Sequence, residues 1–355
     1  MTTVGANFVS THYLANSLVA PVMQAQSQLT SAVAEESTGE YANLGLQLGD
    51  QSGYELSLKE QVGLLQTLTT GNSVVLTSLS TAQNALSAIQ KNAQTTLDNL
   101  VAWTPAGDSG PSLQTMGQSG LQSLISGANT TSGDQYVFGG INSAVAPMAD
   151  YYSTPTSAAK AAVDGAFQTT FGVLPSDPAA ASISASDMQS FLSGPFAALF
   201  EGASWSADWS SASSTNASAE IAPGESVTTS TNANQPGFQQ LAQAYAMLSE
   251  FGGSKLSSDA QQAVATAASS LVSQGVDSMI NAQAELGSTQ SAVASANNSM
   301  SSQLTILQGQ IGDLDNVNTT ATAAQIASLT NQVQMAYELT SRLSQLNLAQ
   351  YLPVP

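Results

Sequence analysis

Apolar residues recur at every seventh position over long stretches near both ends of this chain, and this period limits the folds that the chain can adopt. The N-terminal series are Phe8, Ala15, Val22 and Leu29, followed by Leu58, Leu65, Asn72, Leu79, Leu86, Ala93 and Leu100. A period of seven is typical of a coiled coil, in which each helix buries one stripe against a partner. One helix cannot bury such a stripe alone, so we expect these helices to pair with each other, with neighbouring chains, or with both.

The C-terminal part repeats the pattern. Its series is Val272, Met279, Leu286, Val293, Met300, Leu307 and Leu314, with the amides Gln283, Gln290 and Asn297 at the companion positions. Buried amides at such positions cost stability but fix register and partner. The series breaks around "DLDNVNTTATA", and a last helix is predicted to begin near Thr322. That helix carries Ile326, Leu329 and Val333, and then Leu339, Leu343 and Leu346.

Two features are expected to interrupt the N-terminal helices. Pro21 falls inside the first series and should kink or interrupt the helix there. The stretch "STGEYANLGLQLGDQSGYE" carries four glycines, which makes a sustained helix improbable. The second series then predicts an uninterrupted helix of about 47 residues.

The middle of the chain has a different pattern. "DQYVFGG" predicts a strand over Tyr136, Val137 and Phe138 that ends at a Gly-Gly turn, and "AEIAPGESVTT" predicts a hairpin around Pro223 and Gly224. The aromatic residues Phe191, Phe196, Phe200, Trp205 and Trp209 gather here and could form the core of a small domain.

These patterns predict a mainly α fold, with long discontinuous coiled-coil helices from both chain ends and a β-containing (α+β) outer domain inserted between them. The predicted boundaries are residues 1–130 for the N-terminal helical half, 131–240 for the outer domain, and 241–355 for the C-terminal helical half, paired with 1–130.

The amino-acid composition limits the classes of molecule that this chain can be expected to bind. The chain has five Lys+Arg against 24 Asp+Glu, a formal net charge of −19. Nucleic acid needs basic surface, and so does an anionic membrane, so neither is an expected partner. No apolar run is long enough to predict a membrane span, and the N-terminus does not resemble a secretory signal. With no cysteine, disulfides and thiolate chemistry are excluded.

Residues that could support catalysis are scarce. His12 is the single histidine, beside a heptad position, and a lone histidine is more often structural than catalytic. Trp205 and Trp209 could form a platform for a sugar, although we expect them to be core residues. We therefore predict no enzyme activity, no catalytic residue, no cofactor and no metal site.

Five segments in order along the chain resemble the bacterial flagellin superfamily. They are "QLTSAVAEESTGEYANLGLQLG", "GDQYVFGGINSAVAP", "IAPGESVTTSTNANQPGFQQLAQAYAML", "AELGSTQSAV" and "YELTSRLSQLNLAQYL". The first differs from the family pattern at Glu40, where a basic residue is frequent. Within the superfamily, the closing segment is more similar to the hook-associated subunit that joins hook to filament than to the filament subunit.

The resemblance implies a structural, extracellular protein of the bacterial flagellum, in which the two terminal helices pair and stack in a helical ring. The implied assembly interface consists of Phe8, Ala15, Val22, Leu29, Ile326, Leu329, Val333, Leu339, Leu343 and Leu346. The implied partners are further copies of the chain, a neighbouring hook-associated protein, flagellin, and an export chaperone at the C-terminal helix. Export through the flagellar type III secretion channel would fit the lack of a signal peptide.

Three other hypotheses stay open on the sequence. The chain could be flagellin itself, the filament subunit. It could be an extracellular adhesin or toxin delivered by type III secretion, with the middle domain binding a receptor. It could also be a cytoplasmic helical bundle with a loop domain.

Overall fold

Helices make up most of the computed structural model, which describes residues 11–104, 112–253 and 255–345. The α-helices are α1 (Thr11–Thr38), α2 (Leu44–Leu48), α3 (Ser52–Ala102), α4 (Leu113–Ala128), α5 (Ala158–Phe171), α6 (Ala185–Ser193), α7 (Gly202–Ser204), α8 (Pro236–Phe251), α9 (Ser258–Asp315) and α10 (Thr319–Gln345). Shorter helical turns are η1 (Gly49–Gln51), η2 (Pro178–Ser182), η3 (Ala197–Phe200) and the π-helical turn η4 (Trp205–Trp209). The strands are β1 (Thr131–Ser132), β2 (Gln135–Tyr136), β3 (Ser218–Ala222) and β4 (Glu225–Thr228).

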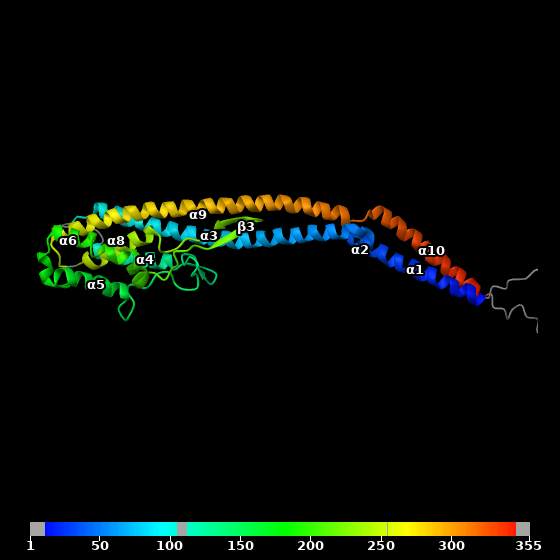
Figure 1. Ribbon diagram of the computed structural model, residues 1–355, viewed down its shortest axis with the longest axis horizontal. Helices are drawn as coiled ribbons and strands as arrows, with labels where there is room; N and C mark the ends of the chain where they lie inside the picture. Colours follow the sequence, from blue (N-terminus) through cyan, green and yellow to red (C-terminus); the bar gives the residue numbers. More distant parts are fainter. Residues whose placement is uncertain (1–10, 105–111, 254, 346–355) are drawn as a thin grey trace, which may run out of the picture. The chain divides into compact units, whose positions relative to one another are not determined.

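The chain divides into two units, and each contains segments that lie far apart in the sequence. The first unit is Met1–Leu64 with Ser302–Pro355, and the second is Leu65–Ser301. Within the first unit, α1 and α10 lie side by side; within the second, hydrogen bonds join α3 to α9 (Figure 1). Helices from the two ends of the chain therefore lie together within each unit.

The helix breaks fall near the predicted places, with one exception. Helix α1 ends at Thr38, and Gly39 follows with φ +77°, a left-handed conformation that glycine adopts without steric cost. Helix α9 ends at Asp315 and α10 begins at Thr319. The interruption predicted at Pro21 is wrong, because α1 continues through this residue. Packing of α1 against α10 outweighs the backbone hydrogen bond that a proline removes.

Heptad positions in α3 and α9 are buried as the spacing predicts. Leu79, Leu86, Val293 and Met300 are each at most 1% exposed. Three glutamines link the helices: Gln83 Nε2 donates to the Gln283 carbonyl, and Gln283 Nε2 donates to Gln90 Oε1, both at 2.8 Å. Asn72, earlier on α3, bonds to Asn297, later on α9, so the two helices are antiparallel.

The aromatic residues of the middle region are core residues, as predicted. Phe191, Phe196, Phe200, Trp205 and Trp209 are at most 1% exposed. They share one continuous core with α4, α8 and the adjoining parts of α3 and α9. Because the two tryptophans are buried there, they form no surface for a sugar. The boundaries 130/131 and 240/241 stay a prediction.

The β structure consists of two small antiparallel hairpins. Thr131 pairs with Tyr136 between β1 and β2, and Ser218 pairs with Thr228 between β3 and β4. The hairpin at Gly224 is confirmed, with φ +77° at this residue. The strand predicted through Val137 and Phe138 is wrong, because β2 ends at Tyr136. The backbone of Phe138 bonds to a different segment, since its carbonyl accepts from the amide of Ala233.

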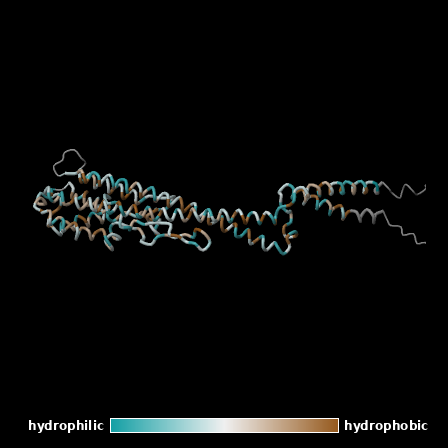
Figure 2. The backbone as a smooth tube through the Cα atoms, turned by 90° about the horizontal axis from the view of Figure 1, so that it is seen from above, coloured by the Kyte–Doolittle hydropathy of each residue, from teal (hydrophilic) through white to brown (hydrophobic). Residues whose placement is uncertain are grey.

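The observed architecture confirms the predicted mainly α fold with an inserted region that contains β-structure. Apolar and polar residues alternate at short intervals along the helices (Figure 2). Within the described residues, no helix combines the length and the apolar character that a membrane span requires.

Candidate assembly surface

The residues predicted for assembly lie on α1 and α10, and the structure places six of them. Leu329 and Val333 are buried, Val22, Leu29 and Ile326 are half-buried, and Leu339 is 48% exposed. Phe8 and Leu346 lie outside the described residues. Ala15 and Leu343 belong to the described helices, but their side chains lie outside the described part.

Helices α1 and α10 pack against each other along a narrow apolar stripe. Ala32 of α1 is 1% exposed, and Thr322, Leu329 and Val333 of α10 are buried. A side-chain hydrogen bond from Gln26 to the Tyr337 hydroxyl also joins the two helices. Small residues such as Ala32 let the helices approach closely, but they leave little area to bury. The pair is therefore stabilised on one face only.

The same two helices expose large apolar side chains elsewhere. Val19, Met23 and Val33 of α1 are 50%, 64% and 49% exposed, and Met335 and Tyr337 of α10 are 61% and 54% exposed. Apolar side chains gathered on short stretches of two paired helices favour contact with another protein. Sequence reasoning missed Met23, Met335 and Tyr337 because they stand off the heptad positions.

Where α1 leads to α2 and α9 leads to α10, two backbone segments run against each other. The Tyr41 amide donates to the Asp315 carbonyl at 2.9 Å, and the Val317 amide donates to the Gly39 carbonyl at 2.8 Å. An antiparallel bridge between Glu40 and Asn316 lies between these two bonds. We call residues 39–41 and 315–317 the linker pair.

A charge cluster with two buried carboxylates adjoins the linker pair. Lys59 forms ion pairs with Glu55 one turn earlier and with Asp315, whose side chains are 11% and 4% exposed. The hydrogen bonds that Lys59 donates to Glu55 and to Asp315 raise the pKa of Lys59 above its ordinary value. Asp315 Oδ1 is buried without a hydrogen-bond partner. The sequence offers one signal for this cluster: basic residues are rare, and Lys59 is one of five.

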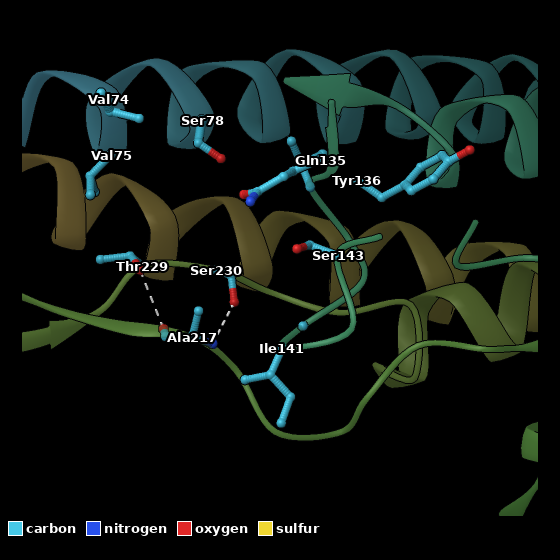
Figure 3. A pocket seen from close by; sticks show the side chains of 12 residues that line it. Val74, Val75, Ser78, Gln135, Tyr136, Ile141, Ser143, Ala217, Thr229 and Ser230 are labelled. Atoms are coloured by element: carbon cyan, nitrogen blue, oxygen red, sulfur yellow. Dashed lines mark hydrogen bonds between the residues drawn. The ribbon is translucent and has the colours of Figure 1, made fainter. Parts of the chain in front are cut away.

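A shallow groove lies in the second unit, where the base of the β3–β4 hairpin meets α3 (Figure 3). Its volume is about 320 Å³, and none of its lining residues is charged. Val74 on α3 and Ile141 in the loop after β2 are 67% and 62% exposed at its edge. The groove offers apolar and neutral hydrogen-bonding contacts, and no histidine or charged residue is among those that line it to activate its hydroxyl groups.

Charged and polar side chains in the core region form hydrogen bonds with one another. Lys160 Nζ donates to Glu250 Oε2 at 2.9 Å, and the Tyr151 hydroxyl donates to Glu250 Oε1 at 3.1 Å. Burial, with the nearby Glu250 charge, raises the pKa of Tyr151 far above that of a free phenol. Across residues 11–104, 112–253 and 255–345, no group of three or more His, Asp or Glu side chains could hold a metal ion. These contacts stabilise the fold.

Comparison with protein families identifies both ends of the chain. Residues 9–143 match the bacterial flagellin N-terminal helical region, and residues 269–352 match the bacterial flagellin C-terminal helical region. The chain belongs to the flagellin superfamily. It is therefore a structural protein of the bacterial flagellum that associates with copies of itself and with other flagellar components. The superfamily is structural and non-enzymatic.

Comparisons with curated proteins and with solved structures add less to the identification of the family. A search of curated proteins found no match. Among solved structures, the chain is similar to a protein described as a flagellar hook-associated protein of Vibrio parahaemolyticus. The identity is 12%, the TM-score is 0.49, and the match covers 75% of this chain and 97% of the other.

Proposed function

We propose that this flagellin-superfamily protein joins the hook to the filament, as a hook-associated subunit assembled in a helical ring through α1 and α10. The observation that carries the assembly role is the exposed apolar surface of the α1–α10 pair, with Met23 and Met335 both more than half exposed. Stacking of neighbouring copies would bury these side chains. At about 25 cal/mol per Å² of apolar area, even modest burial per copy favours assembly.

The choice of the hook–filament junction rests on the sequence. The segment "LSQLNLAQYL" is more similar to the junction subunit than to flagellin, which usually ends in an Ala-Asn-Gln-rich tail before a final leucine pair. The partners we propose are a neighbouring hook-associated protein on one side and flagellin on the other. Flagellin itself is the second candidate, because the same family models describe its helices.

We further propose export through the flagellar type III channel, with a chaperone that covers the apolar face of α10 before assembly. The support is that Met335, Tyr337 and Leu339 are about half exposed or more on this helix. Before assembly, such a face needs a partner to prevent aggregation.

Deletion of the gene tests the proposal, with electron microscopy of the cells and detection of flagellin in the medium. We expect hooks without filaments, and flagellin released into the medium. A strain that lacks filaments and releases no other filament subunit would indicate flagellin instead. A strain that swims normally would contradict both assignments and would favour an adhesin delivered by the same route.

A further inference from the structure

The β3–β4 hairpin contains one residue that its own ladder does not pair. Glu220 pairs with Ser226 and Ala222 pairs with Glu225, so Ile221 between them is the extra residue of a β-bulge. A bulge leaves the extra backbone group without a partner across the hairpin. The Ile221 side chain is 0% exposed, so this backbone is shielded from water. Its carbonyl needs a donor from outside the hairpin.

Asn72 of α3 supplies that donor. Its Nδ2 donates to the Ile221 carbonyl at 2.7 Å and to Asn297 Oδ1 of α9, also at 2.7 Å. Asn72 is 1% exposed. An amide nitrogen carries two hydrogens, so both are used, one on the hairpin and one on the partner helix. Three segments of the second unit thus meet at one side chain.

The apolar contacts of the hairpin with the helices are few. Ile221 is the only fully buried hairpin residue in a small cluster with Val293 and Ala296 of α9, to which a few half-buried side chains are added. An isolated two-stranded hairpin is marginally stable in water, so its order depends on docking. With this little apolar area, we expect the hydrogen bond from Asn72 to contribute substantially to the docking of the hairpin.

We infer that Asn72 is a positioning residue that docks the β3–β4 hairpin on the α3–α9 pair by satisfying the carbonyl of the bulge. Asn72 occupies a heptad position where an apolar side chain would stabilise the helix pair more. The polar side chain of Asn72 therefore binds the hairpin and also helps to fix the register of the two helices. Because the hairpin base lines the groove of Figure 3, Asn72 also sets the shape of that groove. This inference does not depend on the proposed function.

Two variants of the full-length protein distinguish the effects of the two hydrogen bonds that Asn72 donates. Asn297→Leu removes the acceptor on α9 and leaves the bond from Asn72 to Ile221. The double variant Asn72→Leu with Asn297→Leu places apolar side chains at both helix positions and leaves the Ile221 carbonyl without a donor. Replacing both partners of a buried hydrogen bond by apolar groups is close to neutral, so helix pairing should survive in the double variant.

Amide hydrogen exchange, read by mass spectrometry on peptides that cover residues 216–229, is the measurement. We expect exchange in these peptides to be about tenfold faster or more in the double variant than in Asn297→Leu, because one buried carbonyl is left unpaired. Peptides from α4 and α8 should exchange as in the wild type. Asn84→Leu, an exposed position on the same helix, is the control and should change neither region.

Asn72→Asp tests the same bond with a side chain of nearly the same shape that cannot donate when ionised. It should release the hairpin as the double variant does. The inference is overturned if the hairpin stays as protected in both variants as in the wild type, since apolar packing of Ile221 would then suffice. It is also overturned if Asn297→Leu alone releases the hairpin, because that variant keeps the bond to Ile221.

Discussion

The ammonium nitrogen of Lys59 lies 2.9 Å from Asp315 Oδ2, and this ion pair ties α3 to the last residue of α9. The carboxylate of Asp315 is 4% exposed and stands at a helix C-terminus, where the helix dipole disfavours negative charge. Glu55 adds a second buried carboxylate to the same ammonium group. One cation thus balances two acids beside the linker pair, whose two backbone hydrogen bonds involve Asp315 and its neighbour Val317.

Lys59→Met should therefore destabilise the linker pair. It leaves two buried carboxylates without a cation, which we expect to cost about 1–3 kcal/mol, because Lys59 itself is half exposed and partly screened. Amide exchange at Tyr41 and Val317 should rise accordingly. Lys91→Met, at an exposed position of α3, is the matched control. Equal exchange in the two variants would show that the backbone bonds alone hold the linkers.

Alkaline titration should show that two buried tyrosines resist ionisation. Burial raises the pKa of Tyr245 to about 12 and raises that of Tyr151 further. A pKa that is higher in the folded than in the unfolded state means that the folded protein binds more protons above about pH 10, so stability falls as pH rises from there. We expect the rise in tyrosinate absorbance that comes from Tyr151 and Tyr245 to coincide with loss of helical circular dichroism. Tyr245→Phe should lose part of that rise.

The contact between α4 and α8 depends on a glycine. A Cβ atom at Gly117 would lie 2.2 Å from the Ser249 amide nitrogen and 2.6 Å from the Tyr245 carbonyl oxygen, so the two backbones must separate to admit it. Gly117→Ala should lower the free energy of unfolding by about 1–3 kcal/mol, the usual cost of overpacking.

The control for this change is Gly165→Ala in α5, where a Cβ atom meets nothing within 4 Å. Because alanine favours helix over glycine, this variant should gain about 0.5–1 kcal/mol. Urea unfolding of both variants measures the difference. If Gly117→Ala proves as stable as Gly165→Ala, the close approach of the two helices is not required in solution.

The long helices could be predicted because their information is local: an apolar residue every seventh position is visible in any window of the sequence. The partners of Asn72 could not, because Ile221 lies 149 residues away and its need for a donor arises from a bulge. Val137 and Phe138 have the composition of a strand, yet Phe138 packs edge-on against Phe238 and its carbonyl bonds to Ala233. Tertiary contacts therefore overrode local propensity at these two residues.

Leu339 shows the limit of spacing within a helix. It stands four residues before Leu343, a spacing that predicts one shared apolar face. The buried stripe of α10 instead runs through Leu329 and Val333 and continues to Ala336, which is half-buried, whereas Leu339 is 48% exposed. Several apolar stripes fit the same residues, and only the position of α1 decides between them.

The buried stripe of α10 should matter for the folded chain by itself. Leu329 is 5% exposed, and Leu329→Ala removes apolar area from the narrow contact with α1. We expect a loss of about 2–3 kcal/mol in the stability of the first unit, at the lower end of the usual range because the contact is narrow and can relax. Limited proteolysis within α1 and α10 should accelerate, while cleavage in the second unit stays unchanged. Unaltered digestion of α1 would contradict the pairing.

Leu339→Glu should have the opposite effect: the chain should fold normally but should not assemble. In the free chain the side chain is half exposed, so the charge should change stability by no more than about 0.5 kcal/mol. Buried between copies, the same carboxylate would lose its hydration, and the one basic residue of α10 that could pair with it is Arg342, one turn later. Burying an ion pair rarely returns the cost of removing both charges from water, so we expect the change to prevent assembly. A strain that carries Leu339→Glu should secrete the protein and fail to swim, whereas Glu338→Gln, the adjacent exposed position, should swim normally. Normal swimming of the Leu339→Glu strain would place the assembly contacts on a different face of α10.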